Sequence, residues 1–266
     1  MNRDSYYRDH WVEIDEHRLE NYEAMFEWHP RMAPLLDSAN LEVGLNVVDY
    51  GCGPGGLSME LARRVGANGQ VLGLDLNGDM VALAHERVAR EAPAADVRFA
   101  QIENDRIPLD DNTADCVICK SVLEYVTDPA ANIAEFARVV KPGGRVHVID
   151  SDWHMLVAEP LDDDTLTALF GAANHAYRTP RIGRRLYGLM RAAGLVDIDV
   201  RVLAAPDTRG VRAPILLHMV GYAREAGTLA EDVLDAIEAR IEAGLRDGRF
   251  LLILPQFVVS GILPAA

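Results

Sequence analysis

A strand-like run that leads into a glycine-rich loop is the feature that most constrains this chain. The stretch VVDYGCGPGGLSMELA, residues 47–62, begins with apolar and β-branched residues, continues through GCGPGG and ends in a helical pattern. A loop of this composition lets the backbone come close to a ligand, because glycine adopts conformations that other residues avoid. Strand, glycine loop and helix in this order are typical of the first unit of a ligand-binding α/β fold.

The same alternation of strands and helices continues along most of the chain. We expect strands at 45–50, 71–75, 96–100, 114–119, 144–150, 195–204 and 249–263, the last with a break near Pro255. We expect helices at 56–65, 78–91, 129–140, 161–176, 182–193, 214–226 and 229–246. This order predicts a doubly wound, seven-stranded, mostly parallel sheet. Because the last strand returns after a helical excursion, we expect it to be antiparallel.

No repeat, low-complexity tract or linker divides the chain, so we expect one domain over residues 1–266. Within it, residues 1–43 are expected to form a helical cover and 44–150 the cofactor-binding half. The substrate-side half would span 151–266, with a helical insertion at about 205–248. That insertion could serve as a lid or as the surface of a homodimer, and both alternatives stay open.

The negative net charge of the chain argues against some classes of binding partner. Asp and Glu number 41 against 26 Lys and Arg, which gives a net charge of −15. Proteins that bind nucleic acid or anionic membrane surfaces normally carry a basic footprint, so we expect neither. The polar N-terminal stretch lacks the apolar segment of a secretory signal, and we expect a cytoplasmic protein.

The three cysteines predict neither a disulfide framework nor a metal site. Their number is odd, and no second cysteine pair or histidine pair accompanies the CxxC of Cys116 and Cys119. These two cysteines lie on an expected strand, where residues three apart point to opposite faces. We therefore expect both in the core.

Residues around the glycine loop discriminate between possible ligands. GCGPGG satisfies the dinucleotide pattern GxGxxG. However, Pro54 removes one of the amides that a pyrophosphate would need, and Asp49 would repel phosphate but attract an ammonium group. Asp75, at the end of the second expected strand, could accept the hydroxyls of a ribose, which suits either NAD or an adenosyl ligand.

Four segments in order resemble the motifs of class I S-adenosylmethionine-dependent methyltransferases. The resemblance is to the ubiquinone/menaquinone-biosynthesis-like group, methyltransferase type 11, which acts on small molecules. The segments are VVDYGCGPGG, GLDLNGDMVALAHER, FAQIENDRIPLDDNTADCVICKSVLEYVTDP and FARVVKPGGRVHVID, and together they cover about residues 45–150. The resemblance implies a Rossmann-like methyltransferase fold and S-adenosyl-L-methionine as cofactor.

The resemblance also implies a role for matching positions. The methionine part of the cofactor would lie at the first segment, the ribose and adenine at the second and third, and the methyl group after the fourth strand. The residues in these places are Asp49, Gly51, Cys52, Gly53, Asp75, Leu76, Gln101, Ile102, Lys120 and Ser121. Gln101 stands where the family commonly has an aspartate, and its carbonyl could pair with the adenine amino group. Lys120 could instead face solvent at the strand end.

Methyl transfer from a sulfonium mainly requires that the nucleophile be aligned and water excluded. A general base is needed only for a nucleophile that must lose a proton early. His154, after the fifth strand, is the candidate base, although a loop histidine could simply form hydrogen bonds. Glu124 is a second candidate, with a surface helix position as the alternative. On the N-terminal segment, Tyr22 could face the methyl group and Arg31 could pair with the cofactor carboxylate.

These observations predict an enzyme that transfers a methyl group from S-adenosylmethionine to an O, N or C atom of a small-molecule metabolite in an enclosed pocket. A non-catalytic domain that only binds the cofactor is one alternative. An NAD(P)-dependent oxidoreductase is another, which Pro54 and the lack of a Tyr-xxx-Lys pair disfavour. A cluster of arginines at 181–191 could be a solvated helix face or a site that recognises a carboxylate or phosphate. Its members are Arg181, Arg184, Arg185 and Arg191.

Overall fold

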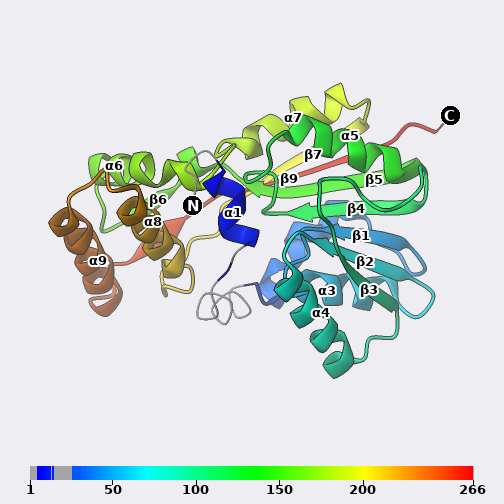
Figure 1. Ribbon diagram of the computed structural model, residues 1–266, viewed down its shortest axis with the longest axis horizontal. Helices are drawn as coiled ribbons and strands as arrows, with labels where there is room; N and C mark the ends of the chain where they lie inside the picture. Colours follow the sequence, from blue (N-terminus) through cyan, green and yellow to red (C-terminus); the bar gives the residue numbers. More distant parts are fainter. Residues whose placement is uncertain (1–4, 13, 15–25, 266) are drawn as a thin grey trace.

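The computed structural model describes residues 5–12, 14 and 26–265. A seven-stranded sheet with the order β3-β2-β1-β4-β5-β9-β7 crosses the centre of the molecule (Figure 1). Its strands are β1 (Asn46–Tyr50), β2 (Gln70–Asp75), β3 (Asp96–Gln101), β4 (Ala114–Lys120), β5 (Val140–Ser151), β7 (Val196–Leu203) and β9 (Gln256–Ile262).

The strand directions are those expected from the sequence. β1 pairs in parallel with both β2 and β4, and β2–β3 and β4–β5 are parallel too. β9 pairs antiparallel with β5 on one side and with β7 on the other. The predicted doubly wound sheet with an antiparallel last strand is therefore confirmed. The carboxyl ends of all the parallel strands meet at one edge, which is where ligands bind in such folds.

Helices cover both faces of the sheet, and their apolar sides form the core. The helices next to the sheet are α3 (Gly56–Val65), α4 (Gly78–Glu91), α5 (Pro129–Val139), α7 (Ile182–Ala192) and the 3₁₀ helix η1 (Pro30–Ala39). One core cluster joins η1 and α3 to the sheet and contains Cys116, whereas the cluster with α5 and α7 contains Cys119. The two cysteines thus lie buried on opposite faces of β4, as their spacing predicts.

The start of α5 illustrates how local sequence determines these boundaries. Asp128 is the N-cap residue, and its Oδ1 accepts hydrogen bonds from the amides of Ala130 at 3.0 Å and Ala131 at 3.2 Å. Pro129 occupies the first helical position, where a missing N–H costs nothing. The helix therefore begins where the Asp-Pro pair predicts.

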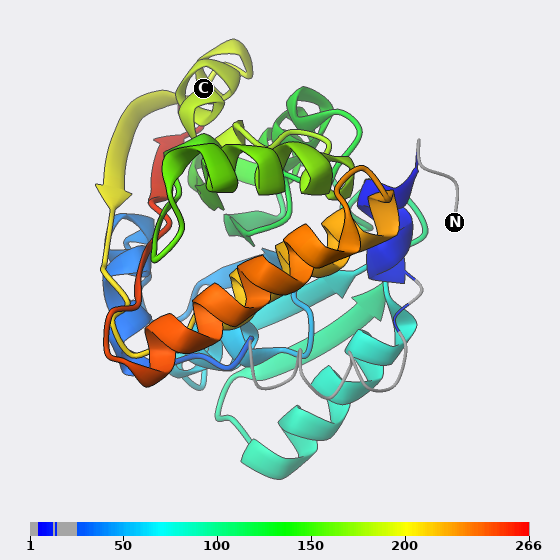
Figure 2. The ribbon, with the colours of Figure 1, turned by 90° about the vertical axis from the view of Figure 1, so that its left-hand side faces the viewer.

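A second layer of helices stands over the carboxyl ends of the strands (Figures 1 and 2). It consists of α1 (Tyr6–Val12), α6 (Asp163–Ala173), α8 (Ala213–Ala226) and α9 (Glu231–Arg246), with the short 3₁₀ helices η2 (Trp153–Met155) and η3 (Asn174–Ala176). In Figure 2, α9 runs diagonally across this end, and Figure 1 shows that α8 lies between α9 and α1. The aromatic and aliphatic side chains of these elements form a core of their own.

Two details of this layer differ from the sequence prediction. The stretch 249–263 is two strands, because β8 (Leu251–Ile253) ends before Pro255 and pairs antiparallel with β6 (Val157–Glu159) in a separate small sheet. Only β9 enters the main sheet. The expected helix at 161–176 is α6 followed by a tighter turn, η3.

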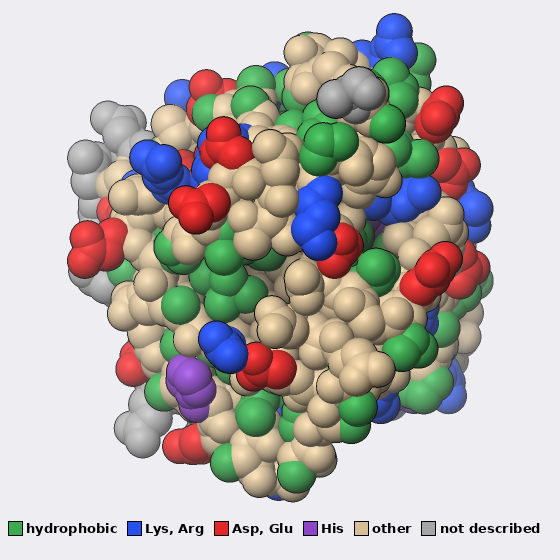
Figure 3. Space-filling view, turned by 90° about the vertical axis from the view of Figure 1, so that its right-hand side faces the viewer, with side chains coloured by type: hydrophobic (Ala, Val, Ile, Leu, Met, Phe, Trp, Pro, Cys, Tyr) green, Lys and Arg blue, Asp and Glu red, His purple; other side chains and the backbone are tan. Residues whose placement is uncertain are grey.

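The opposite end of the molecule, away from these helices, shows acidic and basic side chains interspersed among apolar and polar atoms (Figure 3). Within the residues that the structure describes, no helix has the length and apolar character needed to cross a bilayer. The predicted division of the chain into cover, cofactor-binding half and substrate-side half remains a prediction.

Candidate functional site

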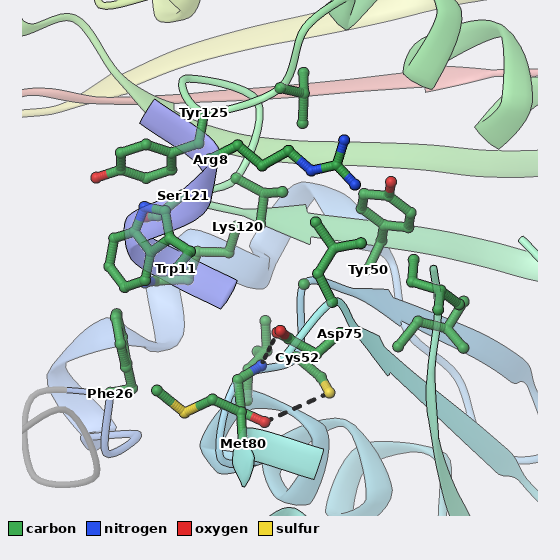
Figure 4. A pocket seen from close by; sticks show the side chains of 18 of the residues that line it. Arg8, Trp11, Phe26, Tyr50, Cys52, Asp75, Met80, Lys120, Ser121 and Tyr125 are labelled. Atoms are coloured by element: carbon green, nitrogen blue, oxygen red, sulfur yellow. Dashed lines mark hydrogen bonds between the residues drawn. The ribbon is translucent and has the colours of Figure 1, made fainter. Parts of the chain in front are cut away.

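A pocket lies where the carboxyl ends of β1, β2 and β4 meet α1 (Figure 4). Its lining comes from the glycine loop, the ends of β2 and β4, the segment after β4, and the N-terminal region. The lining residues are Arg8, Trp11, Ile14, Phe26, Tyr50, Gly51, Cys52, Gly53, Leu57, Leu74, Asp75, Leu76, Met80, Ile102, Asp105, Lys120, Ser121, Val122, Tyr125 and Val126. Eight of the ten residues predicted from motif positions to bind the cofactor line the pocket: Gly51, Cys52, Gly53, Asp75, Leu76, Ile102, Lys120 and Ser121.

The glycine loop needs glycine at two positions for different reasons. Gly51 has φ +76°, and a Cβ built there would lie 2.2 Å from Cγ2 of Val122. Gly53 also has a positive φ, +51°, but a Cβ there would meet no atom within 4 Å. Gly51 is therefore required by conformation and by packing, while Gly53 is required by conformation alone and leaves the loop open toward the pocket.

Asp75 joins the end of β2 to this loop. Its Oδ2 accepts the backbone N–H of Gly53 at 2.8 Å, and its Oδ1 accepts that of Asn77 at 2.9 Å. Burial raises the pKa of this carboxyl, and the hydrogen bonds from Asn77 and Gly53 oppose that rise. Because each carboxylate oxygen has two lone pairs, Asp75 retains acceptor capacity toward the pocket.

Asp49 lies beneath the loop rather than in the pocket lining. Its side chain is buried, and its Oδ2 accepts a hydrogen bond from the hydroxyl of Ser58 at 2.5 Å. Its Oδ1 has no hydrogen-bond partner among the described residues. Burial raises the pKa of this carboxyl to about 7; the negative charge of Asp75 adds to the rise, and Ser58 and Lys120 oppose it. A buried acceptor with spare capacity so close to a pocket is a point at which a cation can be held.

The end of β4 contributes Lys120 and Ser121. Ser121 has a left-handed backbone, φ +56°, and its N–H donates to the carbonyl of Ile149 on the neighbouring strand at 2.8 Å. Burial lowers the pKa of Lys120, and the negative charges of Asp150, Asp49 and Glu124 counteract that fall. Lys120 thus lines a pocket instead of facing bulk solvent, and three carboxyl groups surround it.

The side of the pocket next to α4 is apolar. Leu76, Met80 and Ile102 line it and present a surface suited to a flat ring. Gln101 is exposed and outside the lining, and its Nε2 donates to the backbone carbonyl of Leu76 at 2.9 Å. In this structure Gln101 therefore braces Leu76, and a direct contact with an adenine remains a prediction.

The N-terminal helix α1 closes the pocket from above with residues that sequence reasoning missed. Arg8 and Trp11 extend from α1 toward the strand ends, with Phe26 and Tyr125 nearby (Figure 4). The ring of Trp11 lies 5.0 Å from that of Tyr125 and 6.1 Å from that of Phe26, measured between centroids. The only signal in the sequence was the concentration of aromatics in YYRDHWV, a stretch whose position over the pocket depends on long-range packing.

Tyr50 was also missed, although it follows Asp49 in the first motif. Its hydroxyl accepts a hydrogen bond from Nδ2 of Asn132 at 3.0 Å and donates to Oδ1 of Asp105 at 3.4 Å. The ring packs edge-on against Phe136 and also lines the pocket. Tyr50 therefore couples the pocket wall to α5.

The predicted catalytic histidine lies away from this pocket. Asp152 is the N-cap of η2, and its Oδ1 accepts the N–H of His154 at 3.1 Å. This turn buries Trp153 and leaves His154 exposed, where Arg181 Nη2 lies 3.2 Å from its Nδ1. His154 lines a second cleft, and partial burial and the charge of Arg181 lower its pKa.

Glu124 and Arg31, which were also predicted outside the motif positions, are not in the lining either. Glu124 is buried rather than on a helix surface, with its carboxylate bonded to Nε1 of Trp153, and burial keeps its pKa well above the usual range. Arg31 is exposed at the start of η1. Tyr22 lies outside the described residues. The roles predicted for all these residues remain predictions, and the pocket lining does not support those of His154, Glu124 and Arg31.

A family model described as a methyltransferase domain matches residues 41–194, more than half of the chain. The chain belongs to the methyltransferase domain family. The matched region contains the glycine loop, Asp75 and the end of β4, so the predicted membership of the class I S-adenosylmethionine-dependent methyltransferases is confirmed. S-adenosylmethionine is the cofactor of that family. No group of three or more metal-ligating side chains occurs among the described residues of this methyltransferase.

Curated relatives are similar to the methyltransferase over part of their length. An uncharacterized 37.1 kDa protein in a transposon of Streptomyces fradiae is 35% identical over 161 residues, which cover 60% of this chain and 46% of that protein. A ubiquinone/menaquinone biosynthesis C-methyltransferase from Cellvibrio japonicus is 34% identical over 115 residues, 43% of this chain and 46% of that enzyme. The matches thus span about half the length of these relatives.

Solved structures agree on the fold. Phosphoethanolamine N-methyltransferase 2 from Haemonchus contortus, in complex with S-adenosyl-L-methionine, aligns with a TM-score of 0.63 at 19% identity. The alignment covers 97% of this chain and 60% of that one. At this identity the likeness establishes the Rossmann-like methyltransferase fold and nothing finer.

Proposed function

We propose that this methyltransferase transfers a methyl group from S-adenosylmethionine to a small molecule held in the pocket under α1. The observation that carries the proposal is the pair of carboxyl groups at the glycine loop. Asp75 lines the pocket at the end of β2, and Asp49 lies buried beneath the loop with an Oδ1 that has no hydrogen-bond partner in the part of the chain that the structure describes. Two carboxyl groups at this place disfavour a pyrophosphate and favour a ligand with hydroxyls and an ammonium group.

The residues present fit S-adenosylmethionine. Asp75 would accept the ribose hydroxyls, and Leu76, Met80 and Ile102 would pack on the adenine. Asp49 would attract the ammonium group of the methionine part, directly or through water, because its Oδ1 is the buried acceptor that lacks a partner among the described residues.

The bound cofactor supplies an activated methyl group, and the protein has to align the acceptor and keep water away. Trp11, Phe26 and Tyr125 provide aromatic walls at the α1 side of the pocket, and Val122 and Val126 add apolar surface. These side chains favour an acceptor with an apolar or aromatic part. The name of the Cellvibrio relative, a C-methyltransferase of quinone biosynthesis, is compatible with such an acceptor.

We propose that alignment, rather than a general base in the pocket, provides most of the rate enhancement. His154 and Glu124 are absent from the pocket lining. Lys120 is the titratable side chain that lines the pocket next to Ser121 at the end of β4. Its ammonium group would balance the surrounding carboxyl groups and help to orient the acceptor.

Calorimetric titration of the purified protein with S-adenosylmethionine, and in parallel with NAD, tests the cofactor. We expect micromolar binding of S-adenosylmethionine, and loss of at least tenfold in affinity for Asp75→Ala because a hydrogen-bonded charge is removed. Asp79→Ala is the matched control, because Asp79 is an exposed residue of the same region outside the pocket lining. Tighter binding of NAD, or equal affinities for the two variants, would contradict the proposal.

Transfer itself is tested with cofactor labelled in the methyl group and a panel of aromatic and aliphatic acceptors. Label should pass to an acceptor with the wild-type protein and not with Trp11→Ala, provided that the variant still binds the cofactor. If the protein binds the cofactor but no acceptor in a broad panel takes up label, the non-catalytic alternative is favoured.

A further inference from the structure

A second cleft lies between α6, η3 and the start of α7. It is lined by His154, Thr167, Phe170, Gly171, Asn174, Arg178, Thr179, Pro180, Arg181 and Arg185. It shares no lining residue with the pocket under α1. The cleft is therefore a separate place at which a ligand could bind.

The cleft gathers arginines that have no acidic partner. Arg178, Arg181 and Arg185 all line it, and within the described residues none of the three has a carboxylate within 4.0 Å. Arg184, on the same helix, differs because its Nε bonds to the buried carboxylate of Asp152. The guanidinium of Arg178 lies over the ring of Tyr7, with its Cζ 5.6 Å from the ring centroid. In a chain with a net charge of −15, a cleft lined by three arginines that lack a carboxylate partner among the described residues is unusual.

Other groups in the cleft are hydrogen-bond donors as well. A guanidinium can only donate, so in its contact with Arg181 the Nδ1 of His154 accepts and the proton is on Nε2. Thr167, Asn174 and Thr179 add hydroxyl and amide groups. The cleft also adjoins the N-terminus of the 11-residue helix α7, whose N-cap residue Arg181 makes no side-chain capping bond.

We propose that this cleft binds a small oxyanion, the phosphate or carboxylate group of a metabolite, through Arg181 and Arg185. Guanidinium groups bind the paired oxygens of phosphates and carboxylates in a fork geometry. His154 and the polar side chains would complete the donor set. The exposed fraction of these side chains leaves the ligand free to exchange with solvent.

Aromatic contacts connect the cleft with residues that line the first pocket. Tyr177 stacks on Tyr125, which lines that pocket, with 5.6 Å between ring centroids. Tyr177 also stacks on Phe170, which lines the cleft, with 6.2 Å between ring centroids. The amides of Arg178 and Thr179 both donate to the carbonyl of Glu124 at 2.9 Å. An anion in the cleft would therefore bind next to the segment that supports the aromatic wall.

Calorimetric titration with inorganic pyrophosphate and with citrate, at an ionic strength held constant with sodium chloride, tests the proposal. We expect at least one of the two to bind with a dissociation constant in the millimolar range or tighter. Arg181→Ala and Arg185→Ala should each weaken binding about tenfold, because each removes a charged hydrogen-bonding group. The phosphate and carboxylate arms distinguish the two sources of the oxyanion.

Arg191→Ala is the matched control, because Arg191 lies at the other end of α7, outside the cleft. It should bind both anions as the wild type does, and the unfolding temperature of all three variants should be unchanged. Absence of binding to both anions, or an equal loss for Arg191→Ala, would overturn the proposal. Binding of S-adenosylmethionine, measured separately on the same variants, should not change, so the two proposals can fail independently.

Discussion

The carboxylate of Asp75 accepts the backbone N–H of Gly53 at 2.8 Å, so a side chain at the end of β2 holds the glycine loop that follows β1. The same carboxylate accepts the amide of Asn77 at the start of α4. One residue thereby connects two neighbouring strand–helix units at the site where the cofactor is proposed to bind. Substitution of Asp75 should change the conformation of the loop as well as the affinity for the ligand. The unfolding temperature of each Asp75 variant should therefore be measured together with its affinity.

Gly51 and Gly53 should respond differently to alanine. Both residues have positive φ, which costs an alanine about 1 kcal/mol or more. Gly51→Ala also places a Cβ 2.2 Å from Val122, whereas Gly53→Ala meets no atom within 4 Å. We expect a loss in the free energy of unfolding of about 2 kcal/mol or more for Gly51→Ala and about 1 kcal/mol for Gly53→Ala. Urea denaturation measures both, and equal losses would show that packing against Val122 is unimportant.

The affinity for S-adenosylmethionine should rise with pH up to about pH 7. Burial raises the pKa of Asp49 to about 7, so below that pH the free protein carries a neutral carboxyl there. An ammonium group favours the ionised form, and binding must therefore release a proton. Affinity should increase by up to tenfold per pH unit below the pKa and level off above it. Titrations between pH 5.5 and pH 8.5, with Asp49→Asn as the pH-independent comparison, measure this dependence.

The contribution of Asp49 to the free energy of unfolding should decrease as pH rises. Its pKa is higher in the folded protein, about 7, than the ordinary value of 3.8. The folded state therefore binds more protons between those values, and the contribution of Asp49 to stability falls as pH rises through that window. Asp49→Asn should gain stability relative to the wild type from about pH 4 to about pH 7. A stability difference that stays constant over this range in chemical denaturation would contradict the assignment.

Trp11 should report ligand binding. It lines the pocket, whereas Trp28 is buried in the core between η1 and α3 and lies outside the lining. S-adenosylhomocysteine should change the tryptophan fluorescence of the wild type, because an adenine or thioether near the indole alters its surroundings. Trp11→Phe should remove most of this change, and Trp28→Phe should retain it. The reverse pattern would place the ligand away from α1.

Asp128 should contribute to stability by capping α5. Its carboxylate accepts the amides of Ala130 and Ala131, so Asp128→Ala should lower the free energy of unfolding by about 1 kcal/mol. Asp128→Asn keeps an acceptor oxygen and should lose much less. Thermal unfolding of the two variants measures the difference, and similar losses would mean that charge rather than capping stabilises this end.

Local sequence predicted the sheet well, because the order of apolar and polar residues in each strand and helix follows which of its faces are buried. Residues 47–50 are buried, and the apolar side chains of Val47 and Val48 pack on opposite faces, which distinguishes a central parallel strand. Asp128-Pro129 marks a helix start by chemistry that is local. Short elements carried too little signal: β6 is three residues long, and β8 is separated from β9 only by Leu254 and Pro255.

The site was predicted only where its residues belong to a motif. Gly51, Gly53 and Asp75 sit at strand ends, and the topology brings strand ends together. Trp11 reaches the pocket through packing of α1 across the fold, which no local pattern encodes. His154 follows β5 closely enough to be a reasonable candidate, but the Asp152-capped turn directs Trp153 inward and His154 outward.

The position of β9 affects how the sheet can be assembled during synthesis. β9 lies between β5 and β7, although β7 precedes it in the chain. Until residues 256–262 have left the ribosome, β7 lacks β9, the strand with which it pairs, and the edge of β5 that β9 covers stays open. During this interval the unpaired edges of β5 and β7 would be available for chaperones to bind. The entry of β9 closes both edges in a single event, so we expect the nascent chain to acquire protease resistance abruptly at that point.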